Sequence, residues 1–303
     1  MRKDSIEHIY KLAKEDCRVV FIGSDLGAGS IAKYQTELPK QFLMEGISEA
    51  HIVSMAAGLA LTGCKVFIHT IAPFFVRRAL EQIILDIGAE NLDVCILCSG
   101  GGLVYGPLGH SHTMVDDFSI LSTVPNLKLY APADALEMIK ILNEINSSQG
   151  PSYIRMGKGN EKPVTHEFQY SLTSGNFIQG KNHSDNLIIT TGIMLQRCLD
   201  IQRKIEKLNI LHIPQIDSIY SSDCINILKN HKNIFIIEEH LRTGGIYSRV
   251  SDVMISEIIM GLNIKHYSLG NDYIFQYGKQ EQLHEILKLD FDSLLHNIKE
   301  CIK

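Results

Sequence analysis

A glutamate at the predicted start of a helix is the first residue that could do chemistry. Ser48 is a favourable N-cap residue, and Glu49 follows it in the segment GISEAHIVSMAAGLA, residues 46–60. A carboxylate in the first turn of a helix is stabilised by the helix dipole, typically by about 0.3–1 kcal/mol. Taken alone, Glu49 is therefore better explained by helix capping than by catalysis.

A glycine-rich loop carries two histidines. Residues 99–112 read SGGGLVYGPLGHSH and end with His110 and His112. Glycines permit unusual backbone angles, and their order here matches neither the dinucleotide fingerprint nor a P-loop. Loops at the ends of parallel strands often hold the sites of α/β proteins. Catalysis or ligand binding is an open prediction for this loop.

Two aromatic residues follow another predicted strand. In residues 70–83, TIAPFFVRRALEQI, the strand ends, Pro73 breaks the chain, and Phe74 and Phe75 precede a predicted helix. Aromatic side chains at the carboxyl end of a strand can line a ligand crevice, but they also serve as core residues. The segment by itself does not decide between these alternatives.

The one C-x-x-C pattern, Cys95 to Cys98, lies in the apolar run VCILC. Side chains three residues apart on a strand point to opposite faces, which is poor geometry for binding one metal ion. Zinc would also need two further ligands nearby. We therefore predict that both cysteines are core residues.

Short β-rich runs alternate with amphipathic segments of helical length, which predicts an α/β protein with two doubly wound domains. The elements of the first half are strands at 18–23, 65–70, 93–98 and 152–156, and helices at 49–62, 75–90 and 134–146. Those of the second half are strands at 187–191, 209–213 and 233–238, and helices at 194–207, 244–260 and 279–288. We predict a mostly parallel first domain at 1–157, a linker at 158–185 and a second domain at 186–303.

Composition excludes several classes of function. The chain has 303 residues, 45% of them hydrophobic and 21% charged, which suits two soluble globular domains. Its net charge of −5 disfavours nucleic acids and anionic membranes as partners. No apolar run approaches a membrane span, and the N-terminus lacks the apolar core of a signal peptide. We expect a cytoplasmic protein with reduced cysteines.

The three segments, in this order, resemble the pyrimidine-binding domain of the transketolase family. GISEAHIVSMAAGLALTG resembles the family's glutamate helix, FFVRRALEQI the aromatic segment after it, and GHSHTMVDDFSILSTVPNLKLYAPADALE the histidine loop with its following elements. Together with VVFIGSDL at 19–26, the resemblance covers about 1–157. The second half resembles the family's C-terminal domain on weaker grounds, its alternating pattern and the residues EEH at 238–240 and GG at 244–245.

The resemblance implies thiamine diphosphate as cofactor. Its thiazolium ring loses a proton to become a carbanion and then serves as an electron sink. By family analogy, Glu49 bonds the aminopyrimidine ring and favours the tautomer that removes this proton. Phe75 would stack on the pyrimidine, and Arg78 and Asp25 would also contact the cofactor. Burial in an apolar pocket would raise the pKa of Glu49, which suits such proton sharing.

The resemblance also implies substrate contacts. His112 would be the second catalytic residue, reaching the substrate oxygens as a proton donor or hydrogen-bond partner, with His110 beside it. Arg155, at the end of the last strand of the first domain, could bind a phosphate or another substrate anion. A surface ion pair is an equally good explanation of Arg155.

One part of the family's site is missing from this chain. Transketolases hold the diphosphate through Mg²⁺ or Ca²⁺ with a Gly-Asp-Gly segment and a later asparagine, and no Gly-Asp-Gly occurs here. The resemblance therefore implies a split enzyme, in which the metal is held by a separate N-terminal, diphosphate-binding subunit. Small residues on the 49–62 helix would suit the interface between the two chains, and an α₂β₂ heterotetramer is the natural arrangement.

Departures from the family pattern concern the substrate. Leu108 stands in place of an aspartate that reads a sugar hydroxyl, His110 replaces a proline, and Gly100 and Ala72 replace a phosphate-binding histidine and an aromatic residue. We therefore expect transfer of a two-carbon ketol unit to a modified sugar or an aldehyde. The alternatives are the beta subunit of a 2-oxoacid dehydrogenase decarboxylase component and a non-catalytic binding or regulatory subunit. Deoxyxylulose-phosphate synthase is a more distant alternative.

Overall fold

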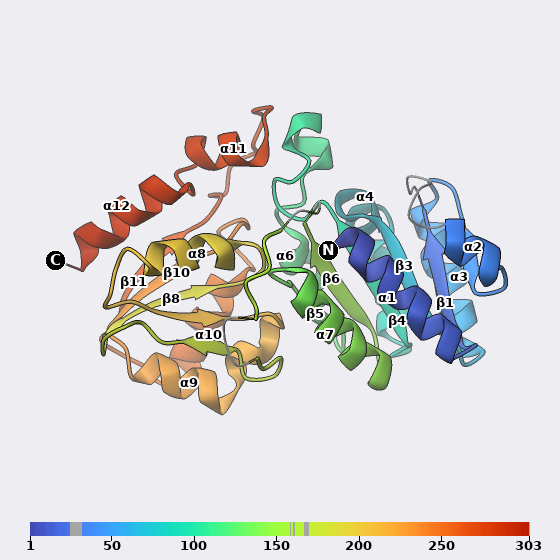
Figure 1. The fold of residues 1–303 in the computed structure, drawn as a ribbon, viewed down its shortest axis with the longest axis horizontal. Coiled ribbons are helices and arrows are strands. Elements are labelled where there is room, and N and C mark those ends of the chain that lie inside the picture. The colour runs from blue at the N-terminus through green and yellow to red at the C-terminus, as the bar shows by residue number, and fades with distance from the viewer. Residues whose placement is uncertain (25–31, 158, 160, 167–169, 303) are drawn as a thin grey trace.

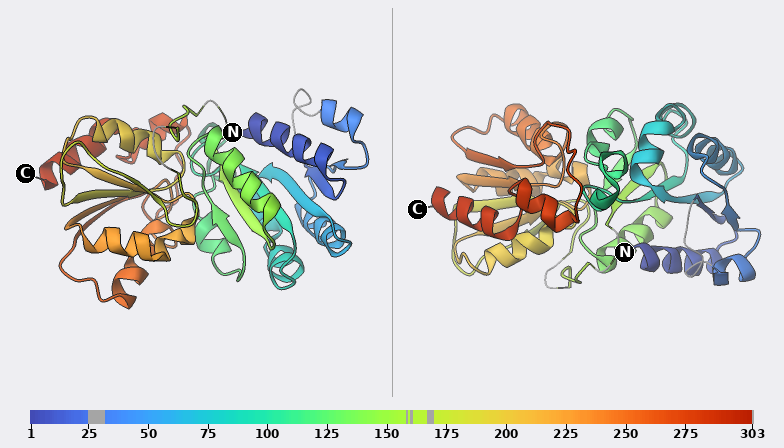
Figure 2. Two further views of the ribbon diagram at one scale, coloured as in Figure 1. Left: turned by 60° about the horizontal axis from the view of Figure 1, so that its bottom comes forward. Right: turned by 90° about the horizontal axis from the view of Figure 1, so that it is seen from above.

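The computed structural model describes residues 1–24, 32–157, 159, 161–166 and 170–302. Asp25, one of the predicted cofactor contacts, lies outside these residues. Two α/β domains lie next to each other along the long axis, with α2 at one end and α12 at the other (Figure 1). Each domain is a sheet covered by helices on both faces (Figure 2). This confirms the predicted fold class.

The sheet of the first domain has six strands, all parallel, in the order β2-β1-β3-β4-β6-β5. The strands are β1 (Val19–Gly23), β2 (Phe42–Met44), β3 (Lys65–Ile71), β4 (Val94–Ser99), β5 (Lys128–Tyr130) and β6 (Ser152–Met156). The long helices are α1 (Arg2–Glu15), α3 (Glu49–Leu61) and α7 (Ala135–Ser147). Shorter ones are α2 (Ala32–Glu37), α4 (Ala72–Arg78), α5 (Leu80–Gln82), η1 (Ile83–Gly88), η2 (Gly106–Leu108), η3 (His110–His112) and α6 (Asp117–Leu121).

Two separate apolar layers cover this sheet. Helices α1 and α7 pack on one face, and α3, α4 and η1 pack on the other. Cys95 and Cys98 of β4 are both buried, one in each layer. The described residues hold no cluster of His, Cys, Asp and Glu suited to a metal ion. The predicted core role of the two cysteines is confirmed.

The second sheet has five strands in the order β11-β10-β8-β9-β7, with β7 antiparallel at one edge. The strands are β7 (Asn176–Ile178), β8 (Asn186–Thr190), β9 (Asn209–His212), β10 (Asn233–Ile237) and β11 (Asn263–Tyr267). The helices are α8 (Met194–Gln202), η4 (Ile216–Tyr220), α9 (Ser222–Lys229), α10 (Ile246–Ser256), α11 (Gln280–Ile286) and α12 (Phe291–Cys301). Among the described residues, no helix is long and apolar enough to cross a membrane.

Several elements differ from the prediction. The helix predicted at 75–90 begins at Ala72 and is divided into α4, α5 and a π-helical turn, η1. Pro73 lies in the first helical turn, where its missing N–H leaves no hydrogen bond unmade, so it starts the helix instead of breaking the chain. β7 lies inside the predicted linker and pairs with β9. The boundaries 1–157 and 186–303 stay a proposal.

The two domains are joined by a continuous apolar layer and by buried polar contacts. Ala131 donates its backbone N–H to the carbonyl of Pro214 at 2.8 Å. The carboxylate of Glu137 on α7 lies 3.0 Å from Nε2 of His212 on β9, and both side chains are fully buried. These contacts hold the two domains against each other.

Candidate functional site

Glu49 is the first residue of α3 and is almost fully buried. Its two carboxylate oxygens accept hydrogen bonds of 3.2 and 3.3 Å from Nη1 of Arg78, the last residue of α4. The Arg78 side chain is half exposed. Ser48 occupies the N-cap position, but its hydroxyl contacts the Gly46 carbonyl and makes no capping bond. A nearly buried acid therefore has a partner that solvent can reach.

Phe74 connects this ion pair to the histidine loop. The Arg78 guanidinium lies 4.3 Å from the centre of the Phe74 ring, and the His112 ring meets the Phe74 ring edge-on, with the ring centres 4.9 Å apart. Phe74 is partly exposed, whereas Phe75 is fully buried in the core. The structure thus brings together Glu49, Arg78, Phe74 and His112, which we call the rim cluster.

The histidine loop has the unusual backbone that its glycines predict. Gly100, Gly102 and Gly109 all have positive φ, at 87°, 65° and 82°. His112 lies 3.0 Å through Nδ1 from the Ser111 hydroxyl. The His110 ring points elsewhere and contacts Phe275 of the second domain at 5.2 Å. The two histidines therefore face different parts of the surface.

Arg155 lies deeper than a surface residue. Its Nε is 3.2 Å from a carboxylate oxygen of Asp117, and its Nη2 donates to the Met114 carbonyl at 2.8 Å. Its guanidinium lies over the Phe118 ring, and its side chain is 9% exposed. This geometry favours the ion-pair explanation, in a buried form, and the substrate role of Arg155 stays a prediction.

The residues EEH at 238–240 join the two domains. Glu238 accepts the N–H of Ile246 at 2.8 Å and so holds the start of α10. Glu239 accepts the N–H of Leu103 at 3.1 Å and lies 2.7 Å from Nε2 of His284. Burial alone would raise the pKa of Glu239, but the nearby His284 and Arg155 bring the pKa of Glu239 below its usual range.

His240, the last of these three, stacks on Phe118 and lies 3.9 Å from Asp117. Burial lowers the pKa of His240. The buried set Asp117, Arg155, Glu239, His240 and His284 is called the interdomain network below. The sequence pattern points to Arg155 and residues 238–240 but does not predict their contacts with Asp117 and His284, because these residues come from distant segments of the chain.

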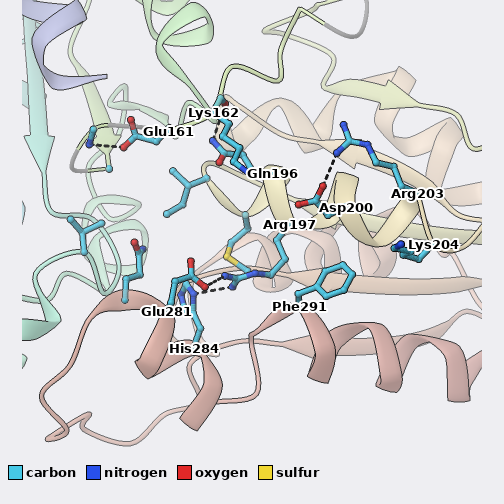
Figure 3. A pocket seen from close by; sticks show the side chains of 16 residues that line it. Glu161, Lys162, Gln196, Arg197, Asp200, Arg203, Lys204, Glu281, His284 and Phe291 are labelled. Carbon is cyan, nitrogen blue, oxygen red and sulfur yellow. Dashed lines mark hydrogen bonds and ion pairs between the residues drawn. The ribbon is translucent and has the colours of Figure 1, made fainter.

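A large cavity lies away from the predicted site. It has a volume of about 770 Å³ and lies between the domains, and none of the predicted site residues lines it (Figure 3). A second cavity of about 490 Å³ is lined by His110 and Ser111 together with residues 271–274. Chemistry, not cavity size, therefore selects the rim cluster as the candidate site.

The fold and the rim cluster define a two-domain α/β protein with a buried acid beside a glycine-rich histidine loop. Models of two transketolase domains match the chain, the pyrimidine binding domain over residues 1–163 and the C-terminal domain over residues 177–294. The chain belongs to the transketolase family. The resemblance inferred from the sequence is confirmed.

Individual relatives agree with this assignment. The chain is 29% identical to a subunit of the apulose-4-phosphate transketolase of Phocaeicola vulgatus, over 93% of this chain and 94% of that protein. It is 30% identical to 1-deoxy-D-xylulose-5-phosphate synthase of Clostridium perfringens, over 98% of this chain but 48% of that protein. A split gene transketolase, solved as an inactive β₄ tetramer, has the same fold, with a TM-score of 0.84, 23% identity and coverage of 99% and 97%.

Proposed function

We propose that this chain is the C-terminal subunit of a split, thiamine-diphosphate-dependent transketolase-like enzyme. It would transfer a two-carbon ketol unit from a ketose donor to an aldehyde or sugar acceptor. The observation that carries the proposal is the rim cluster, in which the buried Glu49 lies beside Arg78 with His112 close by. The cluster contains an acid, a cation and a histidine within one short path of contacts.

The rim cluster fits the cofactor that the family implies. A nearly buried carboxylate whose partner is half exposed can accept a hydrogen bond from, or share a proton with, a ring nitrogen. When bound, thiamine diphosphate supplies a stabilised carbanion and an electron sink. Phe74 is partly exposed to solvent, whereas Phe75 is fully buried. Stacking on Phe75, as the family resemblance implies, would require the surrounding core residues to move.

Arg78 and His112 have separate proposed roles. Arg78 must release Glu49 before the carboxylate can meet a ring nitrogen, and its half-exposed side chain can turn away while staying near Phe74. His112 would hold a substrate oxygen and move a proton to or from it, with His110 on the same loop as a further substrate contact. Asp25 keeps its predicted cofactor contact as a proposal only.

The proposed partner is an N-terminal subunit that holds the diphosphate and Mg²⁺ or Ca²⁺, in an α₂β₂ heterotetramer. The chain spans almost all of the Phocaeicola vulgatus subunit and about half of the Clostridium perfringens synthase, which supports a division into two chains. The cytoplasm is the proposed location, in keeping with seven free cysteines.

A second candidate is a synthase-type reaction that takes its two-carbon unit from pyruvate. The 30% identity to the Clostridium perfringens synthase supports it. A 2-oxoacid dehydrogenase beta subunit would use the same class of donor. The donor and the acceptor are therefore the parts of the proposal that an assay must assign.

The test is to co-express this chain with the chain encoded beside it and to add thiamine diphosphate and Mg²⁺. Ketol transfer would be measured from xylulose 5-phosphate, hydroxypyruvate and pyruvate. Activity with either of the first two supports the transketolase proposal, and activity with pyruvate alone supports the second candidate. Full activity of this chain without a partner would disprove the split enzyme.

A further inference from the structure

The cavity between the two domains has the size and position of a ligand site. Its volume of about 770 Å³ lies within the range of small-molecule pockets. Gly157, which follows β6, and Val104, in the loop after β4, line one side. Helices α8 and α11 and the start of α12 form the other side (Figure 3). Ligands of parallel α/β sheets usually bind outside the carboxyl ends of the strands.

The lining of this cavity is more basic than the chain as a whole. Four of its side chains are cationic and three are acidic, although the net charge of the chain is −5: Lys162, Arg197, Arg203 and Lys204 against Glu161, Asp200 and Glu281. Glu161 is paired 3.1 Å from the amino group of Met1, and Asp200 is paired 2.6 Å from Arg203. In the part of the chain that the structure describes, the ammonium groups of Lys162 and Lys204 have no ion-pair partner. The cavity therefore carries surplus positive charge.

Arg197 is the best-positioned of these cations. Its side chain is 13% exposed, and its Nη1 donates to the Leu289 carbonyl at 2.6 Å and lies 2.9 Å from His284. Its anionic partner is Glu281, at 2.5 Å, whose side chain is 72% exposed. Because the Glu281 side chain is largely exposed, it can turn into solvent and leave its place on Arg197 to a ligand oxyanion. Since Nη1 already contacts the Leu289 carbonyl and His284, the Nη2 group that now meets Glu281 is the donor offered to a phosphate oxygen.

A chain of hydrogen bonds leads from this arginine to the loop that holds the histidines. His284, which contacts Arg197, lies 2.7 Å from Glu239, and Glu239 accepts the N–H of Leu103. The next residue, Val104, lines the cavity. An anion bound at Arg197 would therefore be linked through three contacts to the glycine-rich loop.

The geometry points to a binding site for a phosphate monoester in this cavity, with Arg197 as its ligand and with Lys162 and Lys204, elsewhere on the lining, adding positive charge. In the bound state, the phosphate takes the place of the Glu281 carboxylate on Arg197. The site does not depend on the proposed ketol transfer, since it can be tested by binding alone.

The experiment measures binding to the isolated chain by calorimetric titration, using ribose 5-phosphate, orthophosphate and ribose as probes. We expect the phosphorylated sugar to bind and ribose not to bind; binding of orthophosphate as well would show that the phosphate group alone suffices. Arg197→Gln should weaken binding about tenfold or more and Lys204→Gln about threefold. Glu281→Gln should tighten binding, because it removes the competing carboxylate.

Lys229→Gln is the matched control, since Lys229 is an exposed cation paired with Glu257 on another part of the second domain. It should leave the Kd unchanged. The site would be disproved if the wild-type chain bound neither phosphate, or if Lys204→Gln and Glu281→Gln both bound like the wild type. Because these two variants lie at the cavity surface, the result does not depend on whether Arg197→Gln folds.

Discussion

Two groups of charged and aromatic side chains lie in this chain, and they differ in their access to water. In the rim cluster, Glu49 is buried but Arg78 is half exposed and His112 is partly exposed. In the interdomain network, Glu239 and His240 are both buried; Glu239 is bonded to His284, and His240 lies 3.9 Å from Asp117. Both groups contain a glutamate, an arginine and a histidine, so residue type alone does not distinguish a reactive site from a structural contact.

This comparison indicates that the role of a buried charged residue depends on the groups that pair with it. A buried charge is costly unless other groups satisfy it, and the interdomain network satisfies Glu239 with a histidine and a backbone N–H. Glu49 instead meets, among the residues that the structure describes, the guanidinium of Arg78, which solvent can reach. Glu49 can therefore exchange its partner for a ligand, whereas Glu239 is held by partners from both domains.

The largest expected effect is at Glu49. Glu49→Gln keeps the shape of the side chain but removes its charge and proton-accepting capacity, so kcat of the assembled enzyme should fall by about 10²–10⁴. The measurement is the steady-state rate of ketol transfer. Glu45→Gln, in the strand-to-helix connection before α3, is the control and should keep the wild-type rate. An assembled Glu49→Gln enzyme with full activity would contradict the assignment.

The second effect should appear in stability and not in chemistry. Glu137 and His212 are fully buried and join the domains, so Glu137→Ala leaves an unpaired buried histidine and should destabilise the chain by about 3–5 kcal/mol. Urea unfolding measures this change. Glu144→Ala, on the exposed side of the same helix, should change the unfolding free energy by less than about 0.5 kcal/mol. Equal effects of both variants would refute the distinction.

A third effect concerns the stability of the folded chain at low pH. His69 on β3 is buried, and burial lowers its pKa to about 3 from an ordinary value of 6.5. As the pH falls below 6.5, His69 is protonated in the unfolded chain but stays neutral in the folded chain. The folded chain therefore has its full stability above pH 6.5 and loses stability as the pH falls. His69→Leu should therefore reduce the pH dependence of the unfolding free energy by about 1.4 kcal/mol per pH unit between about pH 6 and 5.

The exposed His183 is the control for this measurement, because His183→Gln should leave the pH dependence unchanged. Unfolding curves at several pH values would show the difference. If His69→Leu kept the wild-type slope, the buried histidine would not be the group that responds to acid.

The smallest expected effect is on stability at Arg78. Because Arg78 is half exposed, the glutamine amide of Arg78→Gln or water can replace the guanidinium on the nearly buried Glu49, so the unfolding free energy should fall by only about 1 kcal/mol. The same variant should change the apparent affinity of the assembled enzyme for thiamine diphosphate. A loss of several kcal/mol would place Arg78 with the structural residues and remove the contrast between the two groups.

Much of the fold follows from side-chain periodicity. The strict alternation of strands places Cys95 and Cys98 on opposite faces, and the two apolar layers confirm it. The glycines at 100, 102 and 109 adopt the positive φ values that only glycine takes up easily. Of the strands that were not predicted, β2, β5 and β7 have three residues each, too few for a periodic pattern to show. The fourth, β11, lies at the edge of its sheet, and its sequence NIKHY contains one aliphatic residue.

The arrangement within the site was harder to predict. Pro73 lies inside the first turn of α4, so the positions of Phe74 and Phe75 on that helix, one outward and one inward, could not be read from a chain expected to break there. Nε of Arg155 lies 3.2 Å from a carboxylate oxygen of Asp117, which belongs to a distant segment of the chain. Local sequence patterns carry no information on such distant contacts, which tertiary packing decides.

The central claim is that Glu49 activates thiamine diphosphate in a pocket shared with another chain. The most direct measurement is the exchange rate of the cofactor's C2 proton with deuterium, followed by NMR in the complex of this chain and its partner with Mg²⁺. We predict fast exchange in the wild-type complex and slow exchange with Glu49→Gln or with this chain alone. Equally fast exchange in the Glu49→Gln complex would contradict the account.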